Sequence, residues 1–215
     1  MKMEEQQVVS QFHDLYYRGT EGGSGNLYMQ TYWMGVLCQK CPLDLWIYQE
    51  IIFEQRPDLI IETGTHSGGS ALFLAQLCDL IGHGHIVSID IDNRPRPAHP
   101  RITYLLGSSS DPAMIEQALA ATSSRENILV ILDSDHSEQH VTRELELLSP
   151  LVKVGGYLIV EDTNINGHPT YPEFGPGPYE AVEKFLARNP NFQVDTAREK
   201  FMMTFNPRGY LKRVR

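Results

Sequence analysis

The stretch that decides the fold is Asp58–Ala71, which reads DLIIETGTHSGGSA. An apolar run ends in an acid, Glu62, and the turn after it holds Gly64, Gly68 and Gly69 before the helical pattern ALFLAQLCDLI. A strand, a glycine turn and a helix in this order form the first unit of a nucleotide-binding α/β sheet. Glycine lets the backbone turn sharply and approach a ligand, and the helix points its free N–H groups into the turn.

The rest of the chain alternates apolar runs with helical patterns. Strands are expected at residues 85–90, 101–106, 127–132 and 157–162, and helices at 42–52, 112–121, 138–152 and 179–189. Residues 8–18 form an amphipathic helical pattern, 27–37 are expected to be partly helical, and 192–214 resemble an antiparallel hairpin. The alternation predicts an α/β fold, a Rossmann-like, doubly wound and mostly parallel sheet with a C-terminal antiparallel hairpin.

The domain organisation follows from the same pattern. We expect one domain over residues 1–215, with 1–50 as an N-terminal helical or lid segment and 57–215 as the Rossmann-like core. The proline- and glycine-rich loop after residue 162 is a second segment long enough to act as a lid.

The composition argues against nucleic acid or membrane as a partner. The formal net charge is −9, whereas phosphate contacts need clustered Lys and Arg. No run approaches the ~20 apolar residues of a membrane span, and the first residues lack a signal-peptide core. Three cysteines in 215 residues suit a reducing compartment, so we expect a soluble, cytoplasmic protein. Cys38 and Cys41 form an isolated CxxC, interpreted as two semi-buried thiols.

Acidic residues stand at the ends of four predicted strands. Glu62 ends the first, Asp90 the second and Asp133 the fourth, and Glu161 and Asp162 end the fifth. Ligands of an open parallel sheet bind outside the carboxyl ends of its strands, so five carboxylates should converge there. They would repel one another unless cations or hydrogen-bond donors lie between them.

The glycine turn itself favours a cationic ligand. Its sequence GTHSGG departs from GxGxxG, and it lacks the lysine of a phosphate-binding P-loop. The Glu62 carboxylate would also repel a pyrophosphate. S-adenosylmethionine fits better, because it carries an ammonium, a sulfonium and a ribose diol.

Four motifs, ETGTHSGGSA, SIDID, LDSDHS and VEDTNING, together resemble the class I S-adenosylmethionine-dependent methyltransferases. The chain is most similar to the branch that contains cephalosporin hydroxylase CmcI and the rhamnosyl or macrolide sugar O-methyltransferases, and the likeness runs from Trp33 onward. The resemblance implies that Glu62, Gly64, His66 and Ser70 surround the methionine end of the cofactor. It implies the ribose at Asp90 and the adenine near Ser109. The full set of residues that the resemblance implies for cofactor binding is Glu62, Gly64, Thr65, His66, Ser67, Gly69, Ser70, Asp90, Ser109 and Asp133.

The same resemblance implies a Mg²⁺ ion, or another divalent cation, on Asp133, Glu161 and Asp162. Carboxylate oxygens suit a hard octahedral cation. Asp135 is an alternative to Asp133 as a ligand, and a second interpretation of Asp133 is a helix cap.

Histidine chemistry is expected in the same region. His136 stands where the catechol enzymes carry a lysine base, so it is our catalytic base together with Asp133; the alternative is a surface histidine paired with Asp135. His168 lies in the second lid and is a possible substrate contact, whereas His140 is expected on a solvent-facing helix turn.

These residues and the resemblance predict an O-methyltransferase acting on a small-molecule hydroxyl. The resemblance implies a sugar of a natural product or glycolipid as the first choice of substrate. A catechol or phenol substrate is the alternative. Two other classes stay open: an oxygenase with iron on Asp135, His136 and His140, and an accessory cofactor-binding subunit. Tyr171, Phe174 and Tyr179 are candidates for stacking on a ring, and the N-terminal aromatic segment favours a homo-oligomer.

Overall fold

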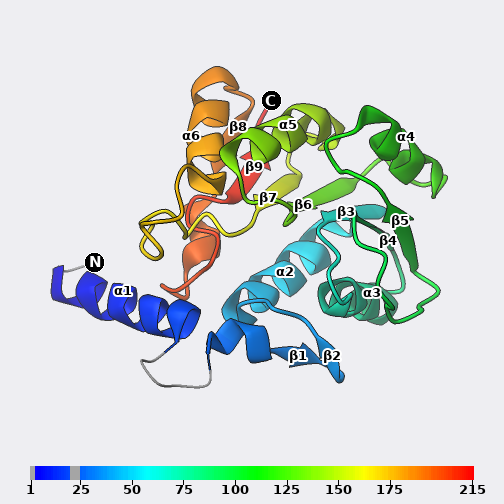
Figure 1. Cartoon of the computed structure of the whole chain (residues 1–215). Coiled ribbons are helices and arrows are strands. Elements are labelled where there is room, and N and C mark those ends of the chain that lie inside the picture. The colour runs from blue at the N-terminus through cyan, green and yellow to red at the C-terminus, as the bar shows by residue number, and fades with distance from the viewer. Residues whose placement is uncertain (1–2, 20–24) are drawn as a thin grey trace.

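The centre of the structure is a seven-stranded sheet in the order β5-β4-β3-β6-β7-β9-β8 (Figure 1). This computed structural model describes residues 3–19 and 25–215. The strands are β3 (Leu59–Thr63), β4 (His85–Asp90), β5 (Ile102–Leu106), β6 (Ile128–Leu132), β7 (Tyr157–Val160), β8 (Phe192–Val194) and β9 (Tyr210–Arg213). Five of them are the strands expected between residues 58 and 162.

Strand direction divides the sheet into two parts. The pairs β5–β4, β4–β3, β3–β6 and β6–β7 are parallel, whereas β9 pairs antiparallel with both β7 and β8. The α/β sheet with an antiparallel β8–β9 pair is confirmed, although β9 lies between β7 and β8 and a 3-10 helix, η3 (Thr196–Glu199), interrupts the connection. The chain moves outward from β3 to β5 and then returns to β6, so the topological switch point lies between β3 and β6.

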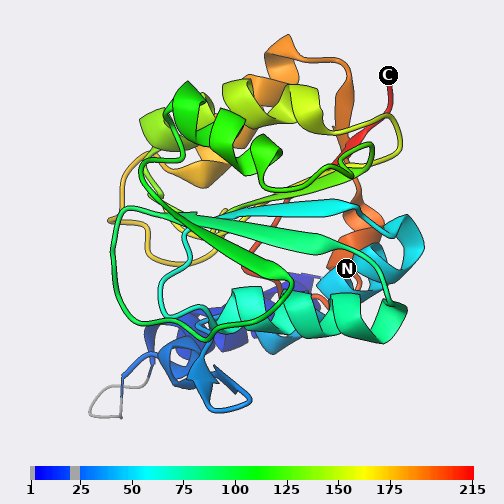
Figure 2. The same ribbon diagram turned by 90° about the vertical axis from the view of Figure 1, so that its right-hand side faces the viewer.

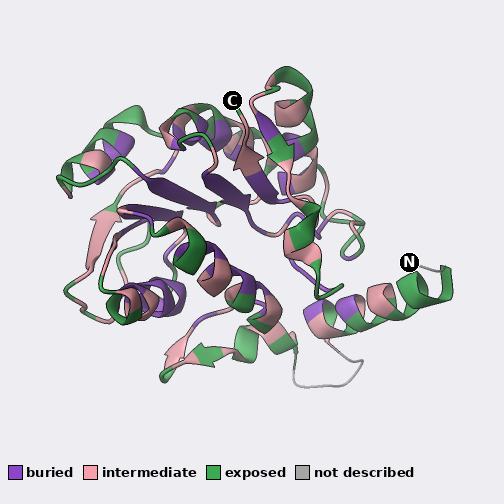
Figure 3. Ribbon diagram, turned by 180° about the vertical axis from the view of Figure 1, so that it is seen from behind, coloured by how far each residue is buried: buried purple, intermediate pink, exposed green. Residues whose placement is uncertain are grey.

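Helices cover both faces of the sheet, as Figure 2 shows. Alternate residues of β3 point to opposite faces: Ile60 packs with α2 (Pro42–Gln55) and α3 (Gly69–Ile81), whereas Leu59 and Ile61 pack with the helices opposite. The opposite helices are α4 (Pro112–Ala120), α5 (Glu138–Leu148) followed by the 3-10 helix η2 (Ser149–Leu151), and α6 (Pro178–Arg188). Burial of both faces explains the continuous apolar strands, which Figure 3 shows as the buried centre.

The N-terminal part forms a separate layer beside the sheet. Helix α1 (Met3–Arg18) projects from the body in Figure 1 and docks through His13 and Tyr17, which pack with Phe205. Residues 27–37, expected to be partly helical, form the 3-10 helix η1 (Leu27–Gln30) and a hairpin of β1 (Tyr32–Trp33) and β2 (Val36–Leu37). The hairpin turn uses positive φ at Met34 and Gly35, the turn geometry that two-residue hairpins favour. Within the described residues, no helix is long and apolar enough to cross a membrane.

Candidate active site

The two sides of the switch point meet at Gly64. Its φ is +82°, and a Cβ there would lie 1.8 Å from the Asp133 carbonyl oxygen. The turn after β3 and the loop after β6 therefore touch through backbone, which brings the glycine turn and Asp133 to one place. His66 and Asp162 also have positive φ, at 46° and 52°, and non-glycine residues in that region cluster at functional sites.

A cavity of about 620 Å³ opens at this edge of the sheet, within the size range of small-molecule sites. Loops after β3, β4, β5 and β6 line it, and Tyr17, Tyr28, Tyr171 and Phe174 close its outer side. The predicted site residues on its wall are Gly64, His66, Asp90, Ser109, Asp133, His136 and Asp162. The predicted residues that are not on its wall are Glu62, Thr65, Ser67, Gly69, Ser70 and Glu161.

Glu62 lies beneath the cavity and is fully buried. Its Oε2 accepts a hydrogen bond from Ser88 Oγ at 2.5 Å, and Thr65 Oγ1 lies 2.7 Å from the same hydroxyl. The other oxygen, Oε1, is buried without a hydrogen-bond partner. Burial raises the pKa of Glu62, and the Lys40 ammonium opposes that shift. An unpaired buried carboxylate oxygen is costly, which favours a donor group of a ligand close to it.

Asp90 is held in place by its neighbours. It accepts hydrogen bonds from the backbone N–H groups of His66 at 2.7 Å and Asp92 at 2.9 Å, and Arg96 lies 3.2 Å from its Oδ2. A carboxylate has about four acceptor sites, so capacity remains for a diol. Our sequence reading missed Arg96, because the loop that carries it shows no periodic pattern.

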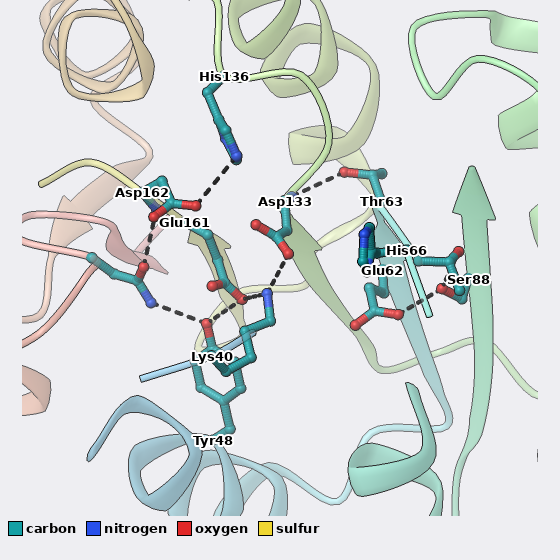
Figure 4. Close-up of polar contacts among 12 residues, drawn as sticks. Lys40, Tyr48, Glu62, Thr63, His66, Ser88, Asp133, His136, Glu161 and Asp162 are labelled. Atoms are coloured by element: carbon teal, nitrogen blue, oxygen red, sulfur yellow. Dashed lines mark hydrogen bonds and ion pairs between the residues drawn. The ribbon is translucent and has the colours of Figure 1, made fainter. Parts of the chain in front are cut away.

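A second polar cluster lies across the cavity from Asp90. Asp133, His136 and Asp162 each offer a ligand atom, and these atoms lie within 4.8 Å of one another, a suitable donor set for a cation. His136 Nε2 is 3.3 Å from Asp162 Oδ2, so His136 pairs with Asp162 and not with Asp135 (Figure 4). Asp133 does not cap the following helix, because Ser137 Oγ accepts from the His140 N–H there.

Glu161 departs from the expected arrangement of three acids. Its side chain is 4% exposed, and Oε1 accepts hydrogen bonds from Lys40 at 2.5 Å and from the Tyr48 hydroxyl at 2.7 Å. It lies outside the group of side chains that could hold a metal among the described residues. The reason is a set of long-range contacts: Lys40 and Tyr48 hold Glu161 beneath the cavity, whereas Asp162, in the left-handed region at φ 52°, lines it.

Lys40 is the functional residue that the sequence reading missed most clearly. Its side chain is 4% exposed and pairs with both Asp133 and Glu161. Burial alone would lower the pKa of Lys40, but the charges of Asp133, Glu161 and Glu62 raise it well above its usual value, so the group stays an ammonium. It lies inside the CxxC segment, between two free thiols that are buried rather than semi-buried as predicted. The convergence of five acids was the one signal that a cation belongs there.

Two further histidines, His140 and His168, are held in place by side-chain contacts. His140 is not solvent-facing: it lines the cavity, with Nε2 3.2 Å from Ser109 Oγ and 3.5 Å from Glu144 Oε1. The hydrogen bond to the buried Glu144 raises the pKa of His140. The iron triad of the alternative oxygenase, Asp135, His136 and His140, is not among the groups of possible metal ligands in the described residues. His168 stacks on Tyr179 with ring centroids 3.6 Å apart, which leaves Tyr171 and Phe174 as the lid aromatics on the cavity.

The fold and the site define a class of protein. A solved apo structure of CmcI superposes with a TM-score of 0.68 at 23% identity, over 87% of this chain and 77% of that one. A CmcI structure described with Mg and SAM gives 0.65 at 23% identity, over 87% and 78%. The architecture is therefore that of the class I methyltransferases.

The family is shown by sequence. The family model for "Rhamnosyl O-methyltransferase/CmcI" matches residues 26–214. A rhamnosyl O-methyltransferase of Mycobacterium bovis is 43% identical over 216 residues, which cover 96% of this chain and 85% of the relative. The chain belongs to the rhamnosyl O-methyltransferase/CmcI family and is a methyltransferase.

Proposed function

We propose that this protein transfers a methyl group from S-adenosylmethionine to a hydroxyl group of a sugar, with rhamnosyl glycosides as the first substrates to test. The observation that carries the proposal is that one cavity at the switch point is lined by both Asp90 and the Asp133–His136–Asp162 cluster. The identity to a rhamnosyl O-methyltransferase across 96% of the chain supports the sugar substrate.

The residues present fit the cofactor. Gly64 lines the cavity, Asp90 retains acceptor capacity for a ribose diol, and the buried Glu62 Oε1 lacks a donor. We assign His66 and Ser109, which also line the cavity, to the cofactor site. Thr65, Ser67, Gly69 and Ser70 shape the turn beneath it. When bound, S-adenosylmethionine supplies an electrophilic methyl group and leaves as its demethylated product.

The residues also fit a divalent cation. Asp133 and Asp162 would hold Mg²⁺, since this ion prefers carboxylate oxygens and retains water. The bound ion would supply a positive charge that lowers the pKa of a substrate hydroxyl. His136 remains as the base: its Nε2 lies at the cluster, and Asp162 orients the ring. The chain's own task is thus to orient the hydroxyl, remove its proton and exclude water.

The aromatic side chains on the outer side of the cavity are suited to a sugar ring. Tyr171 and Phe174 lie with ring centroids 5.8 Å apart, and both line the cavity. Tyr17 and Tyr28 add a stacked pair at 4.8 Å. We propose that these residues cover the acceptor. The single-domain organisation and the homo-oligomer stay predictions; several apolar side chains of α1, including Phe12 and Leu15, are exposed.

An acceptor panel tests the proposal. The isolated chain is incubated with S-adenosylmethionine, Mg²⁺ and either a rhamnosyl glycoside or a catechol, and products are identified by mass spectrometry. We expect methylation of the rhamnosyl glycoside. Methylation of the catechol alone would make the sugar assignment wrong, and an absence of both transfer and cofactor-product binding would make the enzyme assignment wrong.

A further inference from the structure

The buried ammonium of Lys40 lies among the acidic residues at the end of the sheet. Lys40 lies between Asp133 and Glu161, as Figure 4 shows, with its Nζ hydrogen-bonded to a carboxylate oxygen of each. Lys40 and Glu161 are each 4% exposed, whereas Asp133 and Asp162 are 19% and 17% exposed and line the cavity. The acids therefore occupy two levels: Asp133 and Asp162 lie at the cavity wall, and Glu161 lies in a lower, buried level beneath it.

One carboxylate oxygen of Glu161, Oε1, accepts two hydrogen bonds at this lower level. The oxygen that accepts from Lys40 also accepts from Tyr48, whose hydroxyl in turn accepts from Asn206 Nδ2 at 3.0 Å. Tyr48 and Asn206 are both buried, so the network is enclosed by protein. A carboxylate fixed by two donors in this way is not free to turn toward the cavity.

The position of Lys40 depends on close packing of the backbone. A Cβ on Gly69 would lie 2.3 Å from the Leu37 carbonyl oxygen and 2.7 Å from Cys38 Cα. The segment after β2 therefore lies directly on the start of α3, and Lys40 extends from it into the acids. The N-terminal segment thus provides the site with a positive charge.

We propose that Lys40 is a positioning residue, a fixed counter-cation that keeps Glu161 out of the metal site and limits the affinity of that site for divalent cations. This inference rests on the proposed function, because it concerns the ion assigned to Asp133 and Asp162. The physical reason is electrostatic: an ammonium hydrogen-bonded to Asp133 repels a second cation, and it also neutralises the acid that would otherwise be the third ligand.

Manganese titration followed by the electron paramagnetic resonance signal of free Mn²⁺ tests this, with Mn²⁺ as the probe and no cofactor present. Four proteins are compared: wild type, Lys40→Met, Glu161→Gln and the double variant. Lys40→Met should bind Mn²⁺ at least about tenfold more tightly, because the repulsion by Lys40 is lost and Glu161, no longer held by it, becomes a third carboxylate ligand. Glu161→Gln should stay within about threefold of wild type, since Glu161 is not a ligand.

The double variant is the control for charge and folding. It removes one positive and one negative charge, so the buried pair is replaced without leaving an unpaired charge, and its Mn²⁺ affinity should return to within about threefold of wild type. Weakening by about tenfold or more in Glu161→Gln would overturn the inference, because Glu161 would then be a ligand. Unchanged, weaker or absent binding in Lys40→Met would overturn it too.

Failure of the inference is distinguishable from failure of the proposed function. Binding of the demethylated cofactor and methyl transfer to the rhamnosyl glycoside are measured separately on wild type. If both occur while the Mn²⁺ series behaves otherwise than stated, only the role of Lys40 is wrong.

Discussion

At the scale of single residues, Asp90 carries the cofactor assignment most directly. Three neighbours fix its carboxylate at the cavity wall, and no apolar residue could accept from a ribose diol there. Asp90→Asn replaces one acceptor oxygen with a donor, so binding of the demethylated cofactor in isothermal titration should weaken by about 10- to 100-fold.

Glu146→Gln is the matched control for this substitution. Glu146 is an exposed acid that pairs with Arg143 at 3.3 Å on the surface of α5, and such pairs contribute little. Glu146→Gln should bind the demethylated cofactor with the same affinity as wild type. Equal affinities for Asp90→Asn and wild type would contradict the ribose assignment.

Gly64 is the residue on which the junction of the two half-sheets depends. Gly64→Ala forces an L-residue into φ +82° and drives its Cβ into the Asp133 carbonyl, so the free energy of unfolding should fall by about 3 kcal/mol or more. Gly82 has a similar φ, +68°, but nothing lies within 4 Å of a Cβ placed there. Gly82→Ala should therefore lower the free energy of unfolding by only about 1 kcal/mol. Urea unfolding of both variants measures the difference, and equal losses would show that the close approach to Asp133 is unimportant.

At the scale of elements, helix α1 is attached through a histidine that must stay neutral. His13 Nε2 accepts a hydrogen bond from Asn164 Nδ2 at 2.8 Å, and its ring stacks on Phe205. Burial lowers the pKa of His13 from 6.5 to about 4, and the neighbouring Asp14 only partly opposes this shift.

The sign of the pH dependence follows from that shift. The unfolded chain takes up the proton near pH 6.5 and the folded chain only near pH 4, so stability is lost as the pH falls through this window. At pH 5 the loss attributable to His13 is about 2 kcal/mol. Gln does not titrate, so the free energy of unfolding of His13→Gln should fall by about 2 kcal/mol less than that of wild type between pH 7.5 and pH 5. Urea unfolding at the two pH values measures this difference. An identical pH dependence in the two proteins would contradict this account of α1.

The elements also explain how much of the molecule could be predicted. Strands β3 to β7 and helices α2 to α6 follow from local apolar patterns and turn residues, which the chain carries within each segment. The acids Glu62, Asp90, Asp133 and Asp162 could be predicted because parallel strands end at one edge. Lys40 could not be predicted, since its partners lie 93 and 121 residues away and its segment has no pattern. Glu161 was misplaced for the same reason: its direction depends on Lys40 and Tyr48.

At the scale of the whole molecule, two layers of helices cover the sheet, and a cavity opens at the carboxyl ends of its parallel strands. The N-terminal layer closes that cavity with aromatic side chains and delivers Lys40 beneath it. The side of the cavity that we assign to the cofactor is thus built after β3 and β4, and the acid-rich side after β6 and β7. Methyl transfer requires both, because the donor and the activated hydroxyl must meet between them.

The most direct test of the account is therefore a kinetic comparison of two isosteric substitutions, Asp162→Asn and Asp79→Asn. Asp162 lies in the cluster with Asp133 and His136, whereas Asp79 pairs with Arg101 at the end of α3, away from the cavity. Measured with a rhamnosyl glycoside and S-adenosylmethionine, kcat/KM should fall at least about 100-fold in Asp162→Asn and stay at the wild-type value in Asp79→Asn. Wild-type kcat/KM in Asp162→Asn would contradict the claim that the chemistry takes place at this edge of the sheet.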